Sequence, residues 1–164
     1  MRLYSYFRSS ASYRVRIALA LKGLPFEYVP VHLVKDEQLA PAFREVAPAQ
    51  LVPALVVDAA GGGAATLTQS LAIIEYLDET VPEPPLLPKD ALGRARVRTL
   101  ALDIACEIHP LDNLRVLRFL VRDMGLSEDD KNKVSHRARA VAALRGILLT
   151  LVNDRLDEAE RIAG

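Results

Sequence analysis

The chain has little cysteine, no excess charge of either sign and no long apolar run. Its 164 residues include a single cysteine, Cys106, which can form neither an internal disulfide nor a cysteine metal cluster and fits a reducing compartment. Lys plus Arg and Asp plus Glu number 21 each, so no overall field attracts nucleic acid or an anionic membrane. No stretch approaches the roughly 20 apolar residues of a membrane span, and the N-terminus has no signal-peptide apolar region. We therefore expect a cytoplasmic protein that binds a small molecule, with no nucleic acid, membrane or metal ion as partner.

The first third of the chain alternates between strand-like and helix-like segments. Apolar runs at residues 2–6 and 27–31 flank a helical pattern at 10–22, and a further apolar run follows at 54–57. Strands that alternate with helices are typical of βαβ units and of partly parallel sheets. Because 51% of the residues are hydrophobic, the chain can build a core around such a sheet, as one domain or two small ones.

A run of three glycines predicts a hairpin. Gly61, Gly62 and Gly63 separate the apolar run 54–57 from the short run 66–68, which favours two antiparallel strands joined by an enlarged loop. A phosphate-binding loop is the alternative, but no lysine or hydroxyl-capped helix follows these glycines at the spacing that such a loop needs.

A helix that opens at Gln69 and Ser70 should follow the hairpin and end at a proline-rich connector. Its expected apolar face consists of Leu71, Ile74 and Leu77, widened by Ile73. Prolines at 82, 84, 85 and 88 stop a helix and stiffen an extended connector, so we predict a domain boundary there.

The second half of the chain is helical in pattern. A helix over 91–107 would include Cys106 as a small buried residue, and Pro110 should begin or kink a further helix that Gly125 ends. Ser127 and Asp130 resemble a capping box for the next helix. The expected apolar positions of these helices are Leu92, Leu100, Ile104 and Ile108 and then Val141, Leu144, Leu148 and Leu151.

The segment 9–17 is the most informative part of the chain. It reads Ser-Ser-Ala-Ser-Tyr-Arg-Val-Arg-Ile, directly after a predicted strand and at the start of a predicted helix. A hydroxyl-rich turn at a helix start presents backbone N–H groups, side-chain donors and the positive end of the helix dipole to an anionic atom. Taken alone, the same serines favour an ordinary helix cap.

Three separated segments resemble one enzyme family. Residues 9–17, 50–53 and 109–115 are similar to zeta-class glutathione transferases and their maleylacetoacetate isomerase members. The resemblance extends to about residue 126 and implies an α+β, thioredoxin-like N-terminal domain followed by an all-α C-terminal domain. We expect a glutathione-binding domain at 1–82, a linker at 83–90 and a helical domain at 91–164, shortened or altered after about residue 133.

The resemblance implies glutathione contacts at residues spread along the chain. Its cis proline would be Pro53, the backbone of Val52 would pair with the cysteinyl part of glutathione, and Gln69 with Ser70 would hold the γ-glutamyl carboxylate. Taken alone, Val52 and Pro53 favour a rigid strand start, Gln69 and Ser70 an ordinary helix cap, and His109 a structural histidine, while for Gln38 a solvated loop residue is an equal alternative. The full set of expected glutathione contacts is Ser9, Ser10, Ala11, Ser12, Tyr13, Arg14, Gln38, Val52, Pro53, Gln69, Ser70, His109 and Asn113.

The resemblance also implies that the reacting thiol belongs to glutathione and not to the protein. The thiolate adds to a conjugated double bond, the resulting single bond rotates, and the thiolate leaves. Ala11, where isomerase members usually have cysteine, is therefore compatible with the reaction. Ser9 is the expected donor that lowers the thiol pKa, with Ser10 and Ser12 as helper or cap.

Arginines are the expected ligands of a dicarboxylate substrate, because a planar guanidinium holds a carboxylate with two N–H groups. Arg8, beside the serines, and Arg115, on the interdomain segment, are the predicted catalytic arginines. For Arg14 we expect either a glutathione contact or a structural role, and for Arg16 a solvated face.

The resemblance thus implies a glutathione-dependent cis–trans isomerase of maleylacetoacetate type that forms a homodimer. Maleylpyruvate isomerase, a general glutathione transferase and a glutathione-binding module without turnover are the alternatives.

Overall fold

The chain divides into two compact units in its computed structural model, which describes residues 1–59, 61–111, 113–127 and 129. The units comprise residues 1–105 and 106–164. Their division lies beyond the proline-rich connector, so the first helix after the connector belongs to the first unit. Within the described ranges, none of the helices has the length and apolar character needed to cross a membrane.

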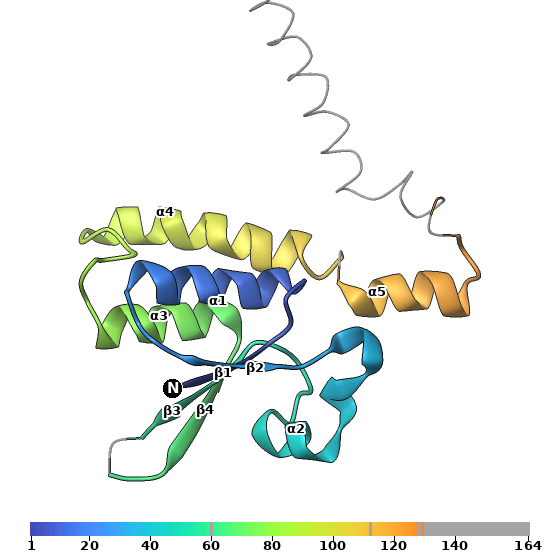
Figure 1. The fold of residues 1–164 in the computed structure, drawn as a ribbon. Helices are drawn as coiled ribbons and strands as arrows, with labels where there is room; N and C mark the ends of the chain where they lie inside the picture. Colours follow the sequence, from blue (N-terminus) through green and yellow to red (C-terminus); the bar gives the residue numbers. More distant parts are fainter. Residues whose placement is uncertain (60, 112, 128, 130–164) are drawn as a thin grey trace, which may run out of the picture. The chain divides into compact units, whose positions relative to one another are not determined.

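A four-stranded sheet forms the centre of the first unit (Figure 1). Strands β1 (Arg2–Ser5), β2 (Glu27–Pro30), β3 (Ala54–Asp58) and β4 (Ala64–Thr68) lie in the order β2-β1-β3-β4. β1 and β2 are parallel and are joined through helix α1 (Ser10–Leu21), whereas β3 is antiparallel to both β1 and β4. The mixed sheet and the glycine-containing hairpin between β3 and β4 are both as predicted.

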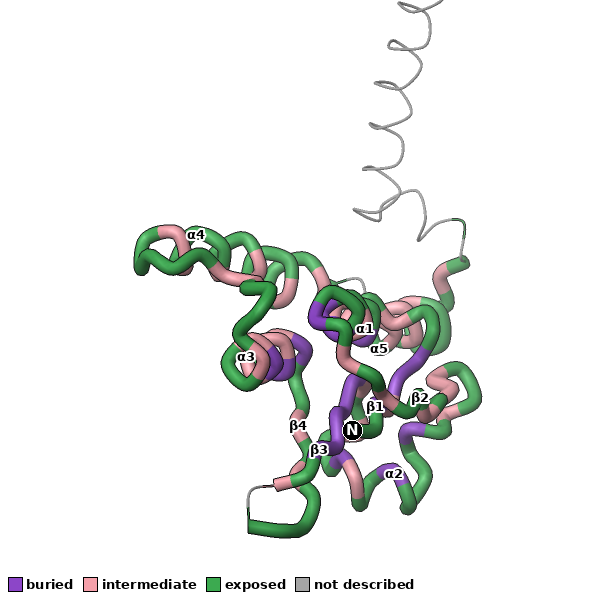
Figure 2. Tube along the Cα trace, turned by 60° about the vertical axis from the view of Figure 1, so that its left-hand side comes forward, coloured by how far each residue is buried: buried purple, intermediate pink, exposed green. Residues whose placement is uncertain are grey.

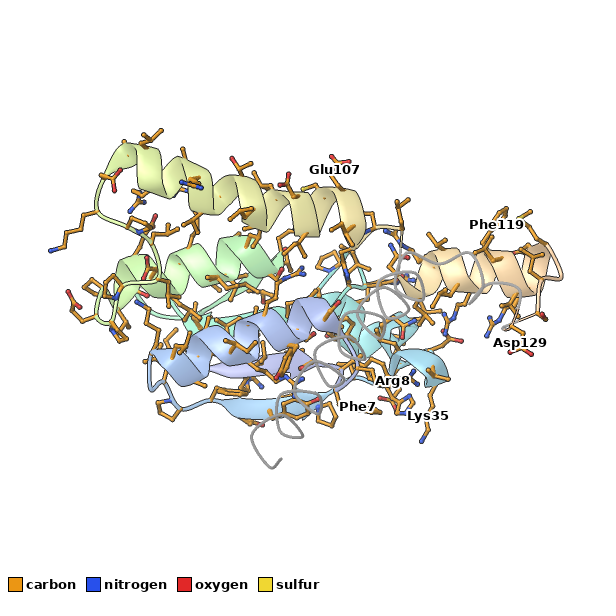
Figure 3. The ribbon with its side chains drawn as sticks, turned by 90° about the horizontal axis from the view of Figure 1, so that it is seen from above. Phe7, Arg8, Lys35, Glu107, Phe119 and Asp129 are labelled. Carbon is orange, nitrogen blue, oxygen red and sulfur yellow. The ribbon has the colours of Figure 1, made fainter. Side chains whose placement is uncertain are left out.

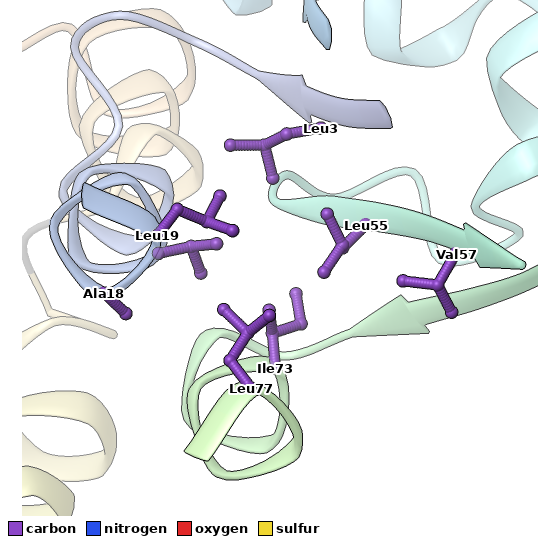
Figure 4. Packing of buried hydrophobic residues seen from close by; sticks show 8 residues of the cluster. Leu3, Ala18, Leu19, Leu55, Val57, Ile73 and Leu77 are labelled. Carbon is purple, nitrogen blue, oxygen red and sulfur yellow. The ribbon is translucent and has the colours of Figure 1, made fainter. Parts of the chain in front are cut away.

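Helices cover both faces of this sheet. α1 and α3 (Ser70–Thr80) lie side by side on one face, while the stretch after β2 covers the other with η1 (Leu33–Lys35), η2 (Glu37–Leu39) and α2 (Pro41–Val46). Because successive strand residues point to opposite faces, neighbouring residues of β3 belong to different cores. The core under α1 and α3 consists of Leu3, Val15, Ala18, Leu19, Leu55, Val57, Ile73 and Leu77 (Figure 4), and the core under α2 consists of Val31, Phe43, Ala47 and Ala54.

Both ends of α1 follow from the local sequence. Ser9 caps the start, because its Oγ accepts the N–H of Ser12 at 3.2 Å. Gly23, with φ of +64°, ends the helix and lets the N–H of Leu24 reach the carbonyl of Leu19 at 3.0 Å. Lys22 is the C-terminal cap, so the helix ends one residue before the predicted bound.

A buried lysine joins α1 to α3 and to the proline-rich connector. The side chain of Lys22 is fully buried, and its Nζ donates to Asp78 Oδ1 at 2.6 Å and to the carbonyls of Val81 and Pro84 at 2.7 and 2.6 Å. Asp78 Oδ1 also accepts the N–H of Leu86 at 2.8 Å. Each of the three ammonium donors therefore has an acceptor, and the connector is tied to the helix pair.

Helix α4 (Ala91–Leu102) belongs to the first unit but contains no buried residue (Figure 2). Asp90 caps it by accepting the N–H of Gly93 at 2.7 Å, and Arg98 donates to Glu75 of α3 at 2.7 Å. The apolar positions predicted for this helix, such as Leu92, are exposed among the described residues. Helical periodicity identified the apolar side chains but not whether another element covers them.

The described part of the second unit is also helical. It comprises the end of the π-helical turn η3 (Asp103–Ile108), then α5 (Leu114–Arg118) and the π-helical turn η4 (Phe119–Asp123). Pro110 lies in the turn before α5 and Gly125, with φ of +70°, follows η4, as predicted. The predicted capping box at Asp130, the apolar stripe from Val141 to Leu151 and the altered segment after about residue 133 lie outside the described residues.

The predicted burial of Cys106 is wrong, and the predicted apolar face of α3 is confirmed except at Leu71. Cys106 is exposed and not a buried helix residue. In α3 the predicted Ile73 and Leu77 are buried and Ile74 packs against the same core, whereas Leu71 is only half-buried. A stripe that repeats every three residues drifts around the helix by about 60° per step, so a buried face needs alternating steps of three and four.

Candidate functional site

The register of the sheet brings three loops to one edge of the first unit. Tyr4, near the end of β1, pairs with Ala54 at the start of β3, and Ala54 pairs with Thr68 at the end of β4. The turn before α1, the residues before β3 and the start of α3 therefore lie at the same edge, which we call the loop edge (Figure 1). These segments carry Ser9, Val52 and Ser70, which the family resemblance assigns to glutathione.

In the serine turn, the hydroxyl of Ser9 is fixed as a hydrogen-bond acceptor at the start of α1. Ser9 is half-buried, its N–H donates to the carbonyl of Tyr6 at 2.9 Å, and its Oγ accepts the N–H of Ser12. The hydroxyl proton of Ser9 is not used in that bond and is available to a further acceptor. Ser10 is the exposed first residue of α1, Ala11 is half-buried beside it, and the side chain of Ser12 is fully buried beneath the turn. Ser9 is thus the cap, and Ser12 contributes its backbone to that cap.

The segment before β3 has the expected proline geometry. The peptide bond between Val52 and Pro53 is cis, and Val52 precedes Ala54, where the register with β1 begins. Gln50 has a positive φ of 57°, and with its amide swapped its side-chain oxygen accepts both Nε and Nη2 of Arg44 at 2.7 Å. This segment is therefore held in place from the α2 side.

At the start of α3, the hydroxyl of Ser70 accepts hydrogen bonds from the guanidinium of Arg14. Arg14 of α1 donates its Nε and Nη2 to Ser70 Oγ at 3.2 and 3.0 Å. Burial lowers the pKa of the Arg14 guanidinium, which nevertheless stays protonated. Gln69 precedes the helix with a φ of +66°, and its side chain makes no capping hydrogen bond to the first turn. Non-glycine residues rarely adopt this conformation, and such positions are common at ligand sites.

Gln38 is buried, which contradicts the alternative that it is a solvated loop residue. Its exposed fraction is 8%, its Nε2 donates to Asp36 Oδ1 at 3.2 Å, and its Oε1 has no hydrogen-bond partner among the described residues. It lies in η2, which follows β2 at the loop edge. A contact between Gln38 and a ligand stays a prediction.

Two arginines near the serine turn differ in their surroundings. Arg8 is exposed at the turn before α1, beside Phe7 (Figure 3). Arg16 is half-buried: it donates to the carbonyl of Phe7 at 3.3 Å and its guanidinium lies 5.0 Å from the ring centroid of the exposed Tyr13. The predicted solvated face of Arg16 therefore holds in part: its bond to Phe7 is exposed, and the side chain also supports the turn that Arg8 occupies.

The remaining predicted residues lie in the second unit, which the structure describes separately from the first. Asn113 caps α5: its Oδ1 accepts the N–H groups of Arg115 and Val116 at 2.9 and 3.2 Å, and its Nδ2 donates to the carbonyl of Pro110 at 2.8 Å. Arg115 is exposed and His109 is half-buried. Asn113 thus has a structural role, and the site roles of all three stay predictions.

Comparison with known proteins bears on the first unit above all. Residues 8–80 match the family described as "Glutathione S-transferase, N-terminal domain". These residues are a glutathione S-transferase N-terminal domain. The chain is 52% identical over 128 residues to a protein named maleylpyruvate isomerase from Ralstonia sp, a stretch that covers 78% of this chain and 58% of that protein.

Two solved structures extend the comparison to the fold. The holo structure of a maleyl pyruvate isomerase, titled a zeta-class bacterial glutathione S-transferase, shares 50% identity at a TM-score of 0.74 and covers 81% of this chain and 60% of that one. A maleylacetoacetate isomerase from Methylobacterium extorquens AM1, titled as bound to malonate and GSH, shares 43% identity at a TM-score of 0.75, covering 84% and 63%. The thioredoxin-like fold is thus shown, and the chain spans about 60% of the length of these relatives.

Sequence reasoning missed two features of this transferase domain. The bond from Arg14 to Ser70 joins residues 56 positions apart, and no local pattern signals such a pair. The rings of Tyr6, Phe7 and His32 also cluster at the loop edge, with centroid distances of 4.8, 5.2 and 6.3 Å. The only sequence signal for that cluster is that Tyr6 and Phe7 follow β1 and His32 follows the parallel strand β2.

Proposed function

We propose that this chain binds glutathione at the loop edge and provides the glutathione-binding part of a cis–trans isomerase for maleyl dicarboxylates, maleylacetoacetate or a close relative. The observation that carries the proposal is the meeting of the serine turn, the residues before β3 and the start of α3 at the loop edge, within residues that match a glutathione S-transferase N-terminal domain. Relatives named maleylacetoacetate and maleylpyruvate isomerase at about 50% identity support the reaction.

The groups at the loop edge suit the parts of glutathione. Ser9 keeps a hydroxyl proton for the sulfur, at the positive end of α1, where a thiolate is stabilised over a thiol. Ser70 and the start of α3 suit the γ-glutamyl carboxylate, together with Gln69. The backbone of Val52 suits the cysteinyl peptide, with Gln38 toward the glycyl end. The remaining proposed contacts are Ser10, Ala11, Ser12, Tyr13, Arg14, Pro53, His109 and Asn113.

The protein's own task in the reaction is electrostatic. Bound glutathione supplies a thiolate that adds to the conjugated double bond and leaves again after bond rotation. Ser9, with help from Ser10, stabilises that thiolate by hydrogen bonding and so lowers the thiol pKa. No side-chain nucleophile is required, which is why Ala11 is compatible with activity.

A dicarboxylate substrate requires cations near the sulfur. We assign Arg8, on the exposed turn before Ser9, and Arg115, near the start of α5, to its two carboxylates. The malonate named in the Methylobacterium structure's title is itself a dicarboxylate, which supports this substrate class.

Maleylpyruvate is the second candidate substrate, favoured by the 52% identity to the Ralstonia protein. A general transferase, or a glutathione-binding module without turnover, would share the same glutathione site.

We also propose the organisation expected from the sequence: a glutathione-binding domain at 1–82, a linker at 83–90, a helical domain at 91–164, and a cytoplasmic homodimer. Light scattering across a concentration series tests the dimer, and a species that stays monomeric at high concentration would contradict it.

The decisive experiment pairs calorimetry with an isomerisation assay. We expect saturable glutathione binding, and glutathione-dependent isomerisation of one or both maleyl compounds. Binding without turnover would show that the chain is a glutathione-binding module and not an enzyme. A folded chain that binds no glutathione would contradict the whole proposal. The ratio of rates on maleylacetoacetate and maleylpyruvate identifies the substrate.

A further inference from the structure

The bond between Arg14 and Ser70 determines what the Ser70 hydroxyl can do. A serine hydroxyl has one proton to donate and two lone pairs to accept with. Arg14 directs two N–H groups, Nε and Nη2, at Ser70 Oγ from 3.2 and 3.0 Å. Both acceptor positions of the oxygen are thereby engaged, so any further partner of Ser70 must accept the hydroxyl proton.

The charge around this hydroxyl has one sign. Arg14 is partly buried and its described acceptor is a neutral oxygen and not a carboxylate, so its positive charge is not cancelled at this contact. The first turn of the 11-residue helix α3 adds the positive end of its dipole at the same place, and no acidic residue lies in that turn. A carboxylate is the ligand group that such a donor and such a field favour.

We infer that Arg14 is a positioning residue that holds the Ser70 hydroxyl as a donor and thereby makes the start of α3 selective for the α-carboxylate of the glutathione γ-glutamyl group. The inference rests on the proposed function, and it assigns to Arg14 a role that acts through Ser70. Without the fork of Arg14, the hydroxyl would be free to rotate and to accept a hydrogen bond instead of donating one.

A purely structural role for Arg14 is the competing explanation, since the bond also joins α1 to α3 across 56 residues. The two explanations differ in ligand dependence. A structural defect weakens every ligand of the site, whereas a positioning defect weakens only ligands that carry the carboxylate. The probes are therefore glutathione and γ-aminobutyryl-cysteinyl-glycine, which lacks only the α-carboxylate of the glutamyl group.

The test measures the affinity of both probes by calorimetry for the full chain and for Arg14→Met, Arg14→Lys and Ser70→Ala. For Arg14→Met we expect glutathione binding to weaken about 10- to 100-fold while the affinity for the analogue changes by less than about 2-fold. Arg14→Lys keeps the charge but offers no planar fork, so an intermediate loss confined to glutathione is expected. The double variant with Ser70→Ala should lose no more glutathione affinity than Ser70→Ala alone.

Arg98→Met is the matched control, because Arg98 also contacts α3 but does so at Glu75. It should bind both probes like the parent. Thermal unfolding of each variant identifies any that fail to fold. If Arg14→Met does not fold, Arg14→Lys and Ser70→Ala still test the inference. Equal losses for both probes, or no loss for either, would overturn the inference while leaving glutathione binding intact. A parent chain that binds no glutathione would instead overturn the proposed function.

Discussion

The helix pair α1 and α3 is joined by two cationic contacts that differ in their acceptors. Arg14 reaches Ser70 at the loop edge, and Lys22 reaches Asp78 eight positions further along each helix, so both pairs are 56 residues apart in sequence. Lys22 is fully buried and meets a carboxylate and two carbonyls, whereas Arg14 meets a neutral hydroxyl. A cation compensated in this way stabilises the fold, and one that is not compensated leaves a field for an anionic ligand.

We call the Lys22–Asp78 end of the helix pair the closed end, because the cation there is compensated, and the Arg14–Ser70 end the open end. The largest expected effect of a substitution is at the closed end. Lys22→Met leaves the Asp78 carboxylate, 13% exposed, without its cation, and should lower the free energy of unfolding by about 3–5 kcal/mol. Denaturant unfolding monitored by circular dichroism measures this. Lys89→Met, on the exposed connector, is the control and should change stability by less than about 0.5 kcal/mol. A loss below about 1 kcal/mol for Lys22→Met would contradict the closed-end description.

Near the open end, Ser9→Ala removes a hydroxyl donor that stabilises the thiolate of glutathione more than its thiol. We expect turnover to fall by the value of one charge-assisted hydrogen bond, about 1.5–3 kcal/mol in the activation barrier, with a smaller loss of glutathione affinity. Steady-state kinetics on a maleyl substrate and calorimetry separate the two effects. Ser9→Thr retains the hydroxyl and should retain most activity. A loss of affinity alone would make Ser9 a binding residue only.

A carboxylate partner for Arg14 at the open end should lower the affinity for glutathione without lowering the stability of the fold. Ser70→Asp gives Arg14 a carboxylate partner within the first turn of α3, where an acidic residue also suits the helix dipole. We expect glutathione affinity to fall at least about 10-fold through repulsion of its carboxylate, while the unfolding temperature stays equal or rises. Unchanged affinity would show that the ligand carboxylate lies elsewhere.

The closed end also predicts an acid limit to stability. Burial alone would raise the pKa of Asp78, but hydrogen bonds from Lys22 and Leu86 and the charges of Lys22 and Arg94 outweigh it and hold the pKa below its ordinary value of 3.8. Because the folded pKa is the lower one, the stabilisation is complete above pH 3.8 and is lost as pH falls through the folded pKa. Asp78→Asn should flatten this acid limb in a pH series of unfolding curves. An unchanged limb would assign the acid sensitivity to other groups.

The smallest effect is expected at the exposed contact of α4. Arg98 and Glu75 are each 40% exposed, so Arg98→Met should leave the unfolding temperature nearly unchanged, and the small difference between parent and variant should shrink as salt is added. If Arg98→Met lowered the stability as much as Lys22→Met does, the difference in exposure would not explain the difference between the two ion pairs.

Local elements and loop chemistry were predictable because the forces behind them act within a few residues. Ser9 is a helix cap and Gly61 to Gly63 form the hairpin turn, each as the local sequence implied. The cis bond before Pro53 was implied by the family resemblance and not by local chemistry. The partial exposure of Leu71 in α3 and the exposure of Cys106 were not predictable in this way. Side chains are buried only where another element covers them, and that is not encoded in the period of one helix.

The sequence by itself determined the order of strands and helices, the caps and the family resemblance, since propensity, turn chemistry and motif spacing are all local. Only the tertiary structure decided that Gln38 is buried, that Arg16 supports the serine turn, and that Arg14 and Lys22 bind opposite ends of α3. The physical reason is that hydrogen bonds and desolvation depend on which atoms meet within about 3 Å, and for residues 56 positions apart only the sheet register and the helix packing determine that.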